Sequence, residues 1–318
     1  MDYVVGIDGG GTKTKLTICD LDGNIIYSTV SGPSNILSSG FDIAKESISQ
    51  VIKEGMIESK YGMDNCVSLC IGVAGAAREE IKKQIHQIVR DTGYKGKLII
   101  THDAETALVG GTGGDEGVLI IAGTGAICFG KTKEGRVHRV SGWGHIIGDE
   151  GSAYSVGVKV LNAVMKAYDG RGRQTILTKN LLDYLDIKSE EEIINLIYKD
   201  SITKQHIASI AILIDGACQL GDEVALEIVS QTVDELYECA EACIRKLNFA
   251  DKSIKVIING GVLVKNTYIN KGFRDKMKDN YPLIEVTTMI HDAAYGAAIM
   301  AIENIDKTSG GGSYNAKH

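Results

Sequence analysis

The chain has 318 residues, about twice the length of an average domain, and a formal net charge of −7. Its 44% hydrophobic and 24% charged residues are typical of a globular protein, which excludes general disorder and predicts two packed domains. The acidic balance, without a cluster of Lys or Arg, argues against nucleic acid or an anionic membrane as a partner. No stretch approaches the roughly 18 apolar residues of a membrane span, and the first residues lack the pattern of a signal peptide. We therefore expect a cytoplasmic protein with no membrane association.

Seven cysteines, an odd number without paired spacing, predict reduced thiols rather than a disulfide framework. The seven histidines form no H-x-x-x-H motif or Cys/His cluster, so we expect no structural zinc. Glycine is abundant, with 38 residues against 2 prolines, and it gathers at the ends of short apolar runs. This placement indicates turns whose backbone approaches a ligand closely.

The first third of the chain predicts a meander of three strands followed by alternating helices and strands. An Asp-Gly hairpin at 22–23 joins the second and third strands, and apolar residues recur with a helical period after it. The expected strands are 3–7, 15–19, 25–30, 67–73 and 97–101, and the expected helices are 42–60 and 78–92.

The same order starts again about 115 residues later, which predicts a duplicated α/β unit rather than a short-repeat array. A flexible turn region at 110–117 leads into it. The expected strands are 118–122, 128–132 and 255–258, residues 151–248 are mainly helical by period, 291–303 is a small-residue helix, and 307–318 is a disordered tail.

The first glycine-rich turn lies within Gly6–Thr14 and contains three consecutive glycines. Their N–H groups are unobstructed and can bind phosphate oxygens, with the hydroxyls of Thr12 and Thr14 as further donors. Asp8, where the strand ends, can hold Mg²⁺ through water. The alternative is a plain glycine-rich β-hairpin, and the segment matches neither a Walker A loop nor a dinucleotide-binding turn.

Two further glycine turns strengthen the phosphate interpretation. Gly123-Thr124-Gly125 follows an apolar strand at the matching place of the second unit, so two such turns can clamp a triphosphate. Asn259-Gly260-Gly261 is flat enough for an adenine ring or a ribose to lie against its backbone. Taken alone, this third turn also fits an ordinary strand-to-helix connection.

Asp103 directly follows an apolar run and precedes an alanine-rich helical sequence. Such an aspartate is commonly a helix N-cap. Because strand ends of one sheet open toward the same edge, it is also placed to act as the single carboxylate that phosphoryl transfer to a hydroxyl requires.

The segment Ser141–Ser152 carries the most specific signal. Trp143, the only tryptophan, lies between Gly142 and Gly144, which favours presentation of its ring to the face of a sugar over packing in a core. A buried loop anchor is the alternative. Asp149 and the neighbouring Glu150 offer hydrogen-bond acceptors for sugar hydroxyls. Asn35, after the first hairpin, can do the same, although an asparagine in a turn often only stabilises the turn.

These segments resemble those of a known superfamily. The three glycine turns are similar to the phosphate 1, phosphate 2 and adenosine turns of the actin/hexokinase/Hsp70 superfamily, and 71–75 and 293–298 resemble its connecting segments. Residues 142–154 resemble the N-acetylglucosamine kinases of the BadF/BadG/BcrA/BcrD ATPase group, and the similarity extends over about 3–303.

The resemblance implies an α/β fold of two duplicated ribonuclease H-like lobes, each with a mixed five-stranded sheet, and an ATP cleft between them. It implies lobes at 1–113 and 114–291, with the helix at about 292–306 packing back on the first. It also implies an ATP:hexosamine 6-phosphotransferase that uses ATP and Mg²⁺ and acts on a small amino sugar, with a homodimer as the expected assembly.

The roles are carried over residue by residue, with Asp103 as the catalytic base and Asp8 as the residue that holds Mg²⁺. The expected ATP ligands are Gly10, Gly11, Thr12, Lys13, Gly123, Thr124, Gly125, Gly260, Gly261 and Lys265. The expected sugar ligands are Asn35, Asp103, Gly142, Trp143, Gly144 and Asp149. One departure concerns the sugar. Ala126-Ile127 stand where the animal enzymes of the group have a polar pair. N-acetylglucosamine, glucosamine and N-acetylmuramic acid therefore all stay open as substrates.

Two other classes of function compete with a sugar kinase. Iron–sulfur ATPases that activate dehydratases share the ATP turns, but their cysteines lie in glycine-rich loops. Here Cys66 and Cys70 start a strand, and Cys239 and Cys243 lie one turn apart on an apolar helix, as buried thiols do. A sugar sensor without catalysis is disfavoured because the Asp103 base is present.

Overall fold

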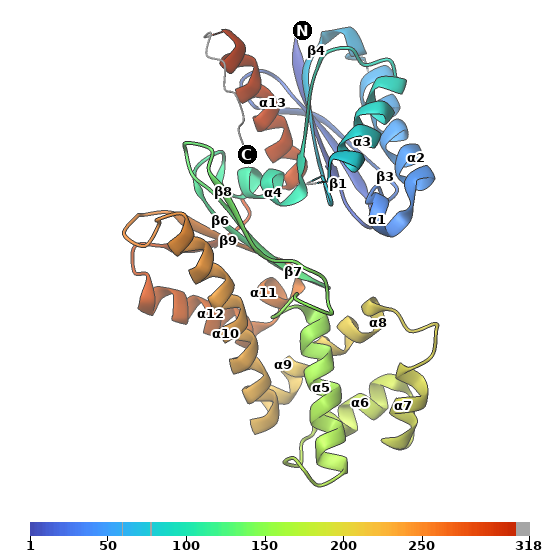
Figure 1. Ribbon diagram of the computed structural model, residues 1–318, viewed down its shortest axis with the longest axis vertical. Coiled ribbons are helices and arrows are strands. Elements are labelled where there is room, and N and C mark those ends of the chain that lie inside the picture. The colour runs from blue at the N-terminus through green and yellow to red at the C-terminus, as the bar shows by residue number, and fades with distance from the viewer. Residues whose placement is uncertain (59, 77, 310–318) are drawn as a thin grey trace. The chain divides into compact units, whose positions relative to one another are not determined.

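The computed structural model describes residues 1–58, 60–76 and 78–309 of the chain. They form two compact units, coloured in chain order in Figure 1. The first comprises Met1–Asp115 and the segment from Met289 onward, and the second comprises Glu116–Thr288.

The first unit is built on a mixed five-stranded sheet with the order β3-β2-β1-β4-β5. The meander β1–β2–β3 is antiparallel, whereas β4 and β5 run parallel to β1 because helices connect them. The strands are β1 (Tyr3–Gly9), β2 (Thr14–Cys19), β3 (Ile25–Ser31), β4 (Cys66–Val73) and β5 (Lys97–His102).

Both faces of this sheet are covered, which explains the continuous apolar runs of its central strands. On one face, Val5, Ile7 and Leu16 pack in a core with α2 and α3. On the other face α13 crosses so closely that a Cβ at Gly6 would lie 2.0 Å from the carbonyl oxygen of Ala294. The helices of this unit are α1 (Ile36–Ser39), α2 (Phe41–Ile52, continued by a π-helical turn Lys53–Ile57), α3 (Glu79–Asp91), α4 (Asp103–Thr112) and α13 (Ala293–Ser309), with a 3₁₀ turn at Met63–Asn65.

The second unit repeats the sheet of the first. Its order, β10-β9-β6-β7-β8, is the same topology with each strand replaced by its counterpart five strands later. Its strands are β6 (Gly117–Ala122), β7 (Ala126–Lys131), β8 (Val137–Ser141), β9 (Lys255–Asn259) and β10 (Glu285–Thr288). The duplication and the α/β class with two mixed five-stranded sheets are thus confirmed.

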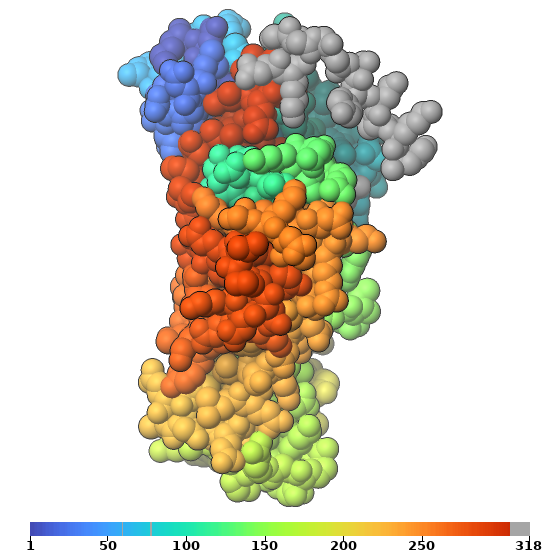
Figure 2. All heavy atoms as spheres, turned by 90° about the vertical axis from the view of Figure 1, so that its left-hand side faces the viewer, coloured from blue at the N-terminus to red at the C-terminus, as the bar shows by residue number. Residues whose placement is uncertain are grey.

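A large helical insertion separates β8 from β9, as the helical period of 151–248 predicts. The long helix α10 contacts β6, β7 and β8, and α9 borders α12. In Figure 2 the yellow segment, which includes α9, adjoins the orange segment, which includes α12. The helices are α5 (Ala153–Tyr168), α6 (Leu177–Leu185), α7 (Glu191–Ile197), α8 (Lys204–Ser209), α9 (Leu213–Gln219), α10 (Glu223–Lys246), α11 (Gly261–Lys265) and α12 (Thr267–Asn280), with a 3₁₀ turn at Ile210–Ile212. No helix among the described residues has the length and apolar character to cross a bilayer.

Two expectations from the sequence were wrong. The flexible turn expected from Gly110 is instead helical up to Thr112. The glycine is there for close packing, since a Cβ at Gly110 would lie 2.3 Å from the carbonyl oxygen of Asp292, just before α13. The tail was also placed too early, because α13 continues through 307–309 until the glycine run begins. The rest of that expected tail, 310–318, lies outside the described residues.

Candidate functional site

The glycine turn after β1 projects from the sheet of the first unit. Gly10 closes it by donating its N–H to the carbonyl of Lys13 at 3.0 Å, and its own carbonyl accepts N–H bonds from Ser34 and Asn35. Gly11, Thr12 and Lys13 are exposed at the tip. These contacts fix the base of the turn and leave the tip free to bind an anion.

Thr14 does not belong to the set of phosphate donors. Its hydroxyl is fully buried and lies 2.7 Å from both the carbonyl oxygen of Gly32 and Oγ of Ser34. The expectation that this hydroxyl faces a ligand was wrong. Its role is to tie the strand to the 32–34 loop.

Asp8 lies within β1, paired with Lys15 in the ladder. Burial, followed by the nearby carboxylates of Asp103 and Asp292, raises the pKa of Asp8 from 3.8 to about 6, against the opposing effect of Lys13 and Lys15. The ends of β1 and β5 and the start of α13 therefore place negative charges together in the first unit. A cation would relieve their repulsion.

Asp103 is the first residue of α4, and the N-cap is His102. Oδ1 of Asp103 accepts the N–H of Ala104 at 2.9 Å and lies 2.7 Å from Nδ1 of His102. The same Nδ1 is 3.1 Å from the nitrogen of Ala104, but one nitrogen cannot both accept that proton and donate to Asp103. The shorter contact favours donation, so His102 orients the carboxylate of Asp103.

Asn35 is half-buried and caps the short helix α1. Its Oδ1 accepts the N–H of Leu37 at 3.0 Å, so the oxygen expected to face a sugar is already used by the backbone. The N–H bond from Asn35 to Gly10 keeps this residue beside the first glycine turn.

The other two glycine turns lie side by side in the second unit. Gly260 has φ +88°, and a Cβ there would lie 2.4 Å from the carbonyl oxygen of Ala122 and 2.8 Å from the nitrogen of Gly123. Only glycine tolerates both the positive φ and this close approach of the backbone of Ala122 and Gly123. The turn at Gly123 also accepts the N–H of Ala153 at 2.8 Å, which places the start of α5 against it.

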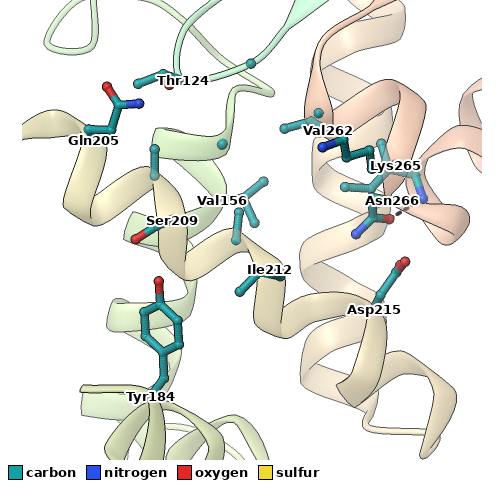
Figure 3. A pocket seen from close by; sticks show the side chains of 16 residues that line it. Thr124, Val156, Tyr184, Gln205, Ser209, Ile212, Asp215, Val262, Lys265 and Asn266 are labelled. Carbon is teal, nitrogen blue, oxygen red and sulfur yellow. Dashed lines mark hydrogen bonds between the residues drawn. The ribbon is translucent and has the colours of Figure 1, made fainter. Parts of the chain in front are cut away.

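These two turns form one wall of a pocket of about 560 Å³ within the second unit (Figure 3). Its volume falls in the range of small-molecule sites. Gly123, Thr124, Gly261 and Lys265, all predicted ATP ligands, line it. The sequence reasoning missed the rest of the lining. Beside Lys265, α11 and the start of α12 add Val262, Asn266 and Ile269. The other wall, from α5, α6, α8, the 3₁₀ turn and α9, adds Ala153, Val156, Tyr184, Gln205, Ala208, Ser209, Ala211, Ile212 and Asp215.

Trp143 is 62% exposed, which is incompatible with the alternative of a buried loop anchor. The guanidinium of Arg139 lies 4.3 Å from the ring centroid, a cation–π distance, and Arg139 donates to the carbonyls of Ser141 and Gly142. A Cβ at Gly148 would lie 3.1 Å from Cβ and 3.2 Å from the backbone nitrogen of Trp143, so this part of the loop packs against the base of the side chain. The ring is thus held in place at the surface.

The rest of the loop is anchored by charged side chains. Oε2 of Glu150 accepts from the hydroxyl of Ser141 at 2.9 Å, so Glu150 stabilises the loop. The N–H of Gly151 donates to Glu235, which also pairs with Lys159 at 2.6 Å.

Asp149 is buried, with φ +60°, and its carboxylate spans two neighbours. Oδ1 accepts the N–H of Gly144 at 3.3 Å, and Oδ2 pairs with Nζ of Lys204 at 2.7 Å. The structure therefore brings Asp149 next to Gly144 and adds Lys204, which has no motif around it.

The carboxylates of the first unit suit a hard cation held jointly with a ligand. Among the described residues, no group of three or more His, Cys, Asp or Glu side chains is arranged to chelate a metal alone. Mg²⁺ commonly binds through one or two carboxylates, waters and substrate phosphates, and Asp8 fits that mode.

Six of the seven cysteines are buried, and Cys239 is half-buried. Burial raises the pKa of Cys66 to about 12 and that of Cys239 to about 11. Such thiols are mainly protonated at neutral pH and behave as core residues.

Comparison with known proteins gives one family over nearly the whole chain. The model of the BadF/BadG/BcrA/BcrD ATPase family matches residues 5–301.

Similar proteins include several named as sugar kinases. The chain is 42% identical to an N-acetylmuramic acid/N-acetylglucosamine kinase of Clostridium acetobutylicum, over 96% of this chain and 100% of the relative. It is 34% identical to an N-acetyl-D-glucosamine kinase of Dictyostelium discoideum, over 95% of this chain and 98% of the relative. The crystal structure of a candidate N-acetylglucosamine kinase from Chromobacterium violaceum superposes with a TM-score of 0.71 at 23% identity, covering 95% of this chain and 99% of that one, which shows a shared fold.

Proposed function

We propose, since the chain belongs to the BadF/BadG/BcrA/BcrD ATPase family, that it transfers the γ-phosphoryl group of ATP to the 6-hydroxyl of N-acetylglucosamine or a closely related hexosamine. The observation that carries the proposal is the pocket of the second unit, because two glycine turns far apart in the sequence meet there. The names of the relatives support an amino sugar as the acceptor.

The pocket takes the nucleoside of ATP. Its lining is mainly apolar. Among its polar side chains, Gln205, Asp215 and Asn266 can orient a base or a ribose, and Lys265 lies beside Asn266 (Figure 3). The backbone of Gly123–Gly125, next to the start of α5, binds phosphate oxygens. In the first unit, the exposed tip Gly11–Lys13 is a second candidate turn for phosphate.

Asp103 accepts the proton of the sugar 6-hydroxyl. The hydroxyl oxygen forms a bond to the γ-phosphorus, and the bond between that phosphorus and the bridging oxygen of ADP breaks. The contact with His102 fixes which oxygen of the carboxylate stays free. Asp8 would hold Mg²⁺ through water, and the cation would supply charge neutralisation for the phosphates.

The sugar is bound through Trp143, whose free face suits the apolar side of a pyranose, and through Asp149 and the backbone of Gly142 and Gly144. Asn35 contributes its amide N–H donors, because its oxygen caps α1. The dual name of the 42% identical relative makes N-acetylmuramic acid a second acceptor to test, followed by glucosamine. A cytoplasmic location and a homodimer stay predictions, to be tested by fractionation and by light scattering.

A panel of hexosamines in a coupled ADP-release assay tests the activity. We expect ADP release with N-acetylglucosamine that depends on both sugar and Mg²⁺. The absence of turnover with N-acetylglucosamine, N-acetylmuramic acid and glucosamine would refute the proposed function. Product analysis by NMR then identifies the phosphorylated hydroxyl.

A matched pair of glycine substitutions tests the nucleotide pocket. Gly261 lines the pocket, and a Cβ built on it meets no atom within 4 Å, so Gly261→Leu should fold and fill space that the nucleotide needs. Gly216 on α9 is equally unobstructed but lies outside the lining. We expect Gly261→Leu to raise the KM for ATP at least about tenfold, as the loss of roughly 1.4 kcal/mol of binding would, and Gly216→Leu to leave it unchanged. Equal effects of the two variants would place the nucleotide elsewhere.

A further inference from the structure

An ion pair between a buried carboxylate and a half-buried lysine joins the loop of Trp143 to α8. Nζ of Lys204, the first residue of α8, lies 2.7 Å from Oδ2 of Asp149, which is only 5% exposed. Asp149 also has its backbone in the left-handed region, which is uncommon outside glycine. Burying a charge and holding such a conformation both cost free energy, so the arrangement points to function rather than to stability.

The same ion pair lies against the second glycine turn. A Cβ placed on Gly125 would be 2.7 Å from Oδ2 of Asp149 and 3.2 Å from Nζ of Lys204. The residues that follow Lys204 on α8, Gln205 and Ser209, line the nucleotide pocket. One ammonium group is thus next to a proposed sugar ligand, to a proposed phosphate turn and to a wall of the pocket.

We infer that Lys204 is a positioning residue shared by both substrates. It holds the carboxylate of Asp149 in the orientation that receives a sugar hydroxyl, and it supplies a positive charge beside the turn that receives the ATP phosphates. The inference rests on the proposed function. Lysine suits this role because its ammonium is a compact charge on a flexible stem, which can contact a carboxylate and a phosphate together.

The test replaces Lys204 by methionine, which keeps the apolar stem and removes the charge. Sugar binding is followed by the fluorescence of Trp143, the only tryptophan, and binding of a non-hydrolysable ATP analogue by calorimetry, so neither measurement requires turnover. Because a hydrogen-bonded charge is lost, we expect sugar affinity to fall about ten- to a hundredfold and affinity for the analogue to fall several-fold.

Two further variants are the controls. Lys276→Met removes a lysine from another ion pair of the second unit, 2.5 Å from Asp234 and outside the pocket lining, and should change neither affinity. Lys204→Arg keeps the charge, so it should recover part of both affinities. It also gives a folded variant for the comparison if Lys204→Met does not fold.

A double-mutant cycle with Asp149→Asn separates the two parts of the inference. If Lys204 acts on the sugar through Asp149, Lys204→Met in the Asp149→Asn background should add little to the loss of sugar affinity and still weaken binding of the analogue. The inference would be overturned if the losses of sugar affinity caused by the two single substitutions multiply in the double variant. A folded Lys204→Met protein with unchanged affinity for either ligand would also overturn it. A wild-type protein that binds no hexosamine would instead refute the proposed function.

Discussion

Replacing Trp143 by alanine separates a sugar-binding role from a structural one, because the two predict different magnitudes. A tryptophan anchored in a core costs about 3 to 5 kcal/mol when truncated. Trp143 is 62% exposed, so little more than a third of a side chain with roughly 200 Å² of surface is buried. At about 25 cal/mol per Å², the lost burial amounts to about 2 kcal/mol at most, part of it from the contact with Arg139.

We therefore expect Trp143→Ala to lower the free energy of unfolding by no more than about 2 kcal/mol, and to raise the KM for the sugar at least about tenfold with little change for ATP. Urea denaturation and steady-state kinetics measure the two effects. Tyr198→Ala is the control, because this aromatic side chain of the second unit is 82% exposed and lies outside both candidate sites. A stable Trp143→Ala protein with an unchanged sugar KM would refute the stacking role, and a loss of more than 3 kcal/mol would restore the anchor.

Two carboxylates of the first unit give further predictions. Asp103→Asn should lower kcat by about 10² to 10⁴ with little change in binding of an ATP analogue, and near-normal turnover would reduce Asp103 to a part of the helix start. The pKa of Asp8 in the folded protein, about 6, lies above its ordinary value of 3.8, so the native state binds a proton more tightly than the unfolded state. The free energy of unfolding therefore falls as pH rises from about 3.8 to 6, by about 3 kcal/mol once the carboxyl is ionised. Without Mg²⁺, Asp8→Asn should be more stable than the wild type at pH 7.5 by up to that amount, with the difference vanishing below about pH 3. Urea denaturation at several pH values measures it, and a difference independent of pH would contradict the assigned cause.

The glycine turns and most strands were predictable because their signals are local, whereas β8 and β10 were not expected from the sequence. A strand buried on both faces must be continuously apolar, and a turn with positive φ or a close backbone approach requires glycine, so β1, β6 and Gly260 carry their structure in a few neighbouring residues. The duplicated order of these short signals was enough to give the fold class.

The misreading of Gly110 shows where local reasoning fails. In the sequence Gly110 resembles part of a flexible turn, but a glycine is required there because the backbone just before α13, about 180 residues later in the chain, packs against it. Lys204 is hidden for the same reason. Nothing around it forms a motif, and its partner Asp149 becomes a neighbour only when α8 folds against the 142–151 loop.

The two units show how one topology yields two different surfaces. In the first, the strand ends carry Asp8, Asp103 and one glycine turn, and the described part of the connection from β3 to β4 contains α1, the twelve-residue helix α2 and two short helical turns. In the second, the strand ends carry glycine turns, and the connection from β8 to β9 contains α5 to α10, whose members α5, α6, α8 and α9 form the far wall of the pocket. Because a glycine turn alone offers only one side of a binding site, the insertion is what converts the duplicated turn into a pocket. Specificity for the nucleotide should therefore follow the sequence of the insertion, and substitutions in its wall should alter KM for ATP without altering the sheet.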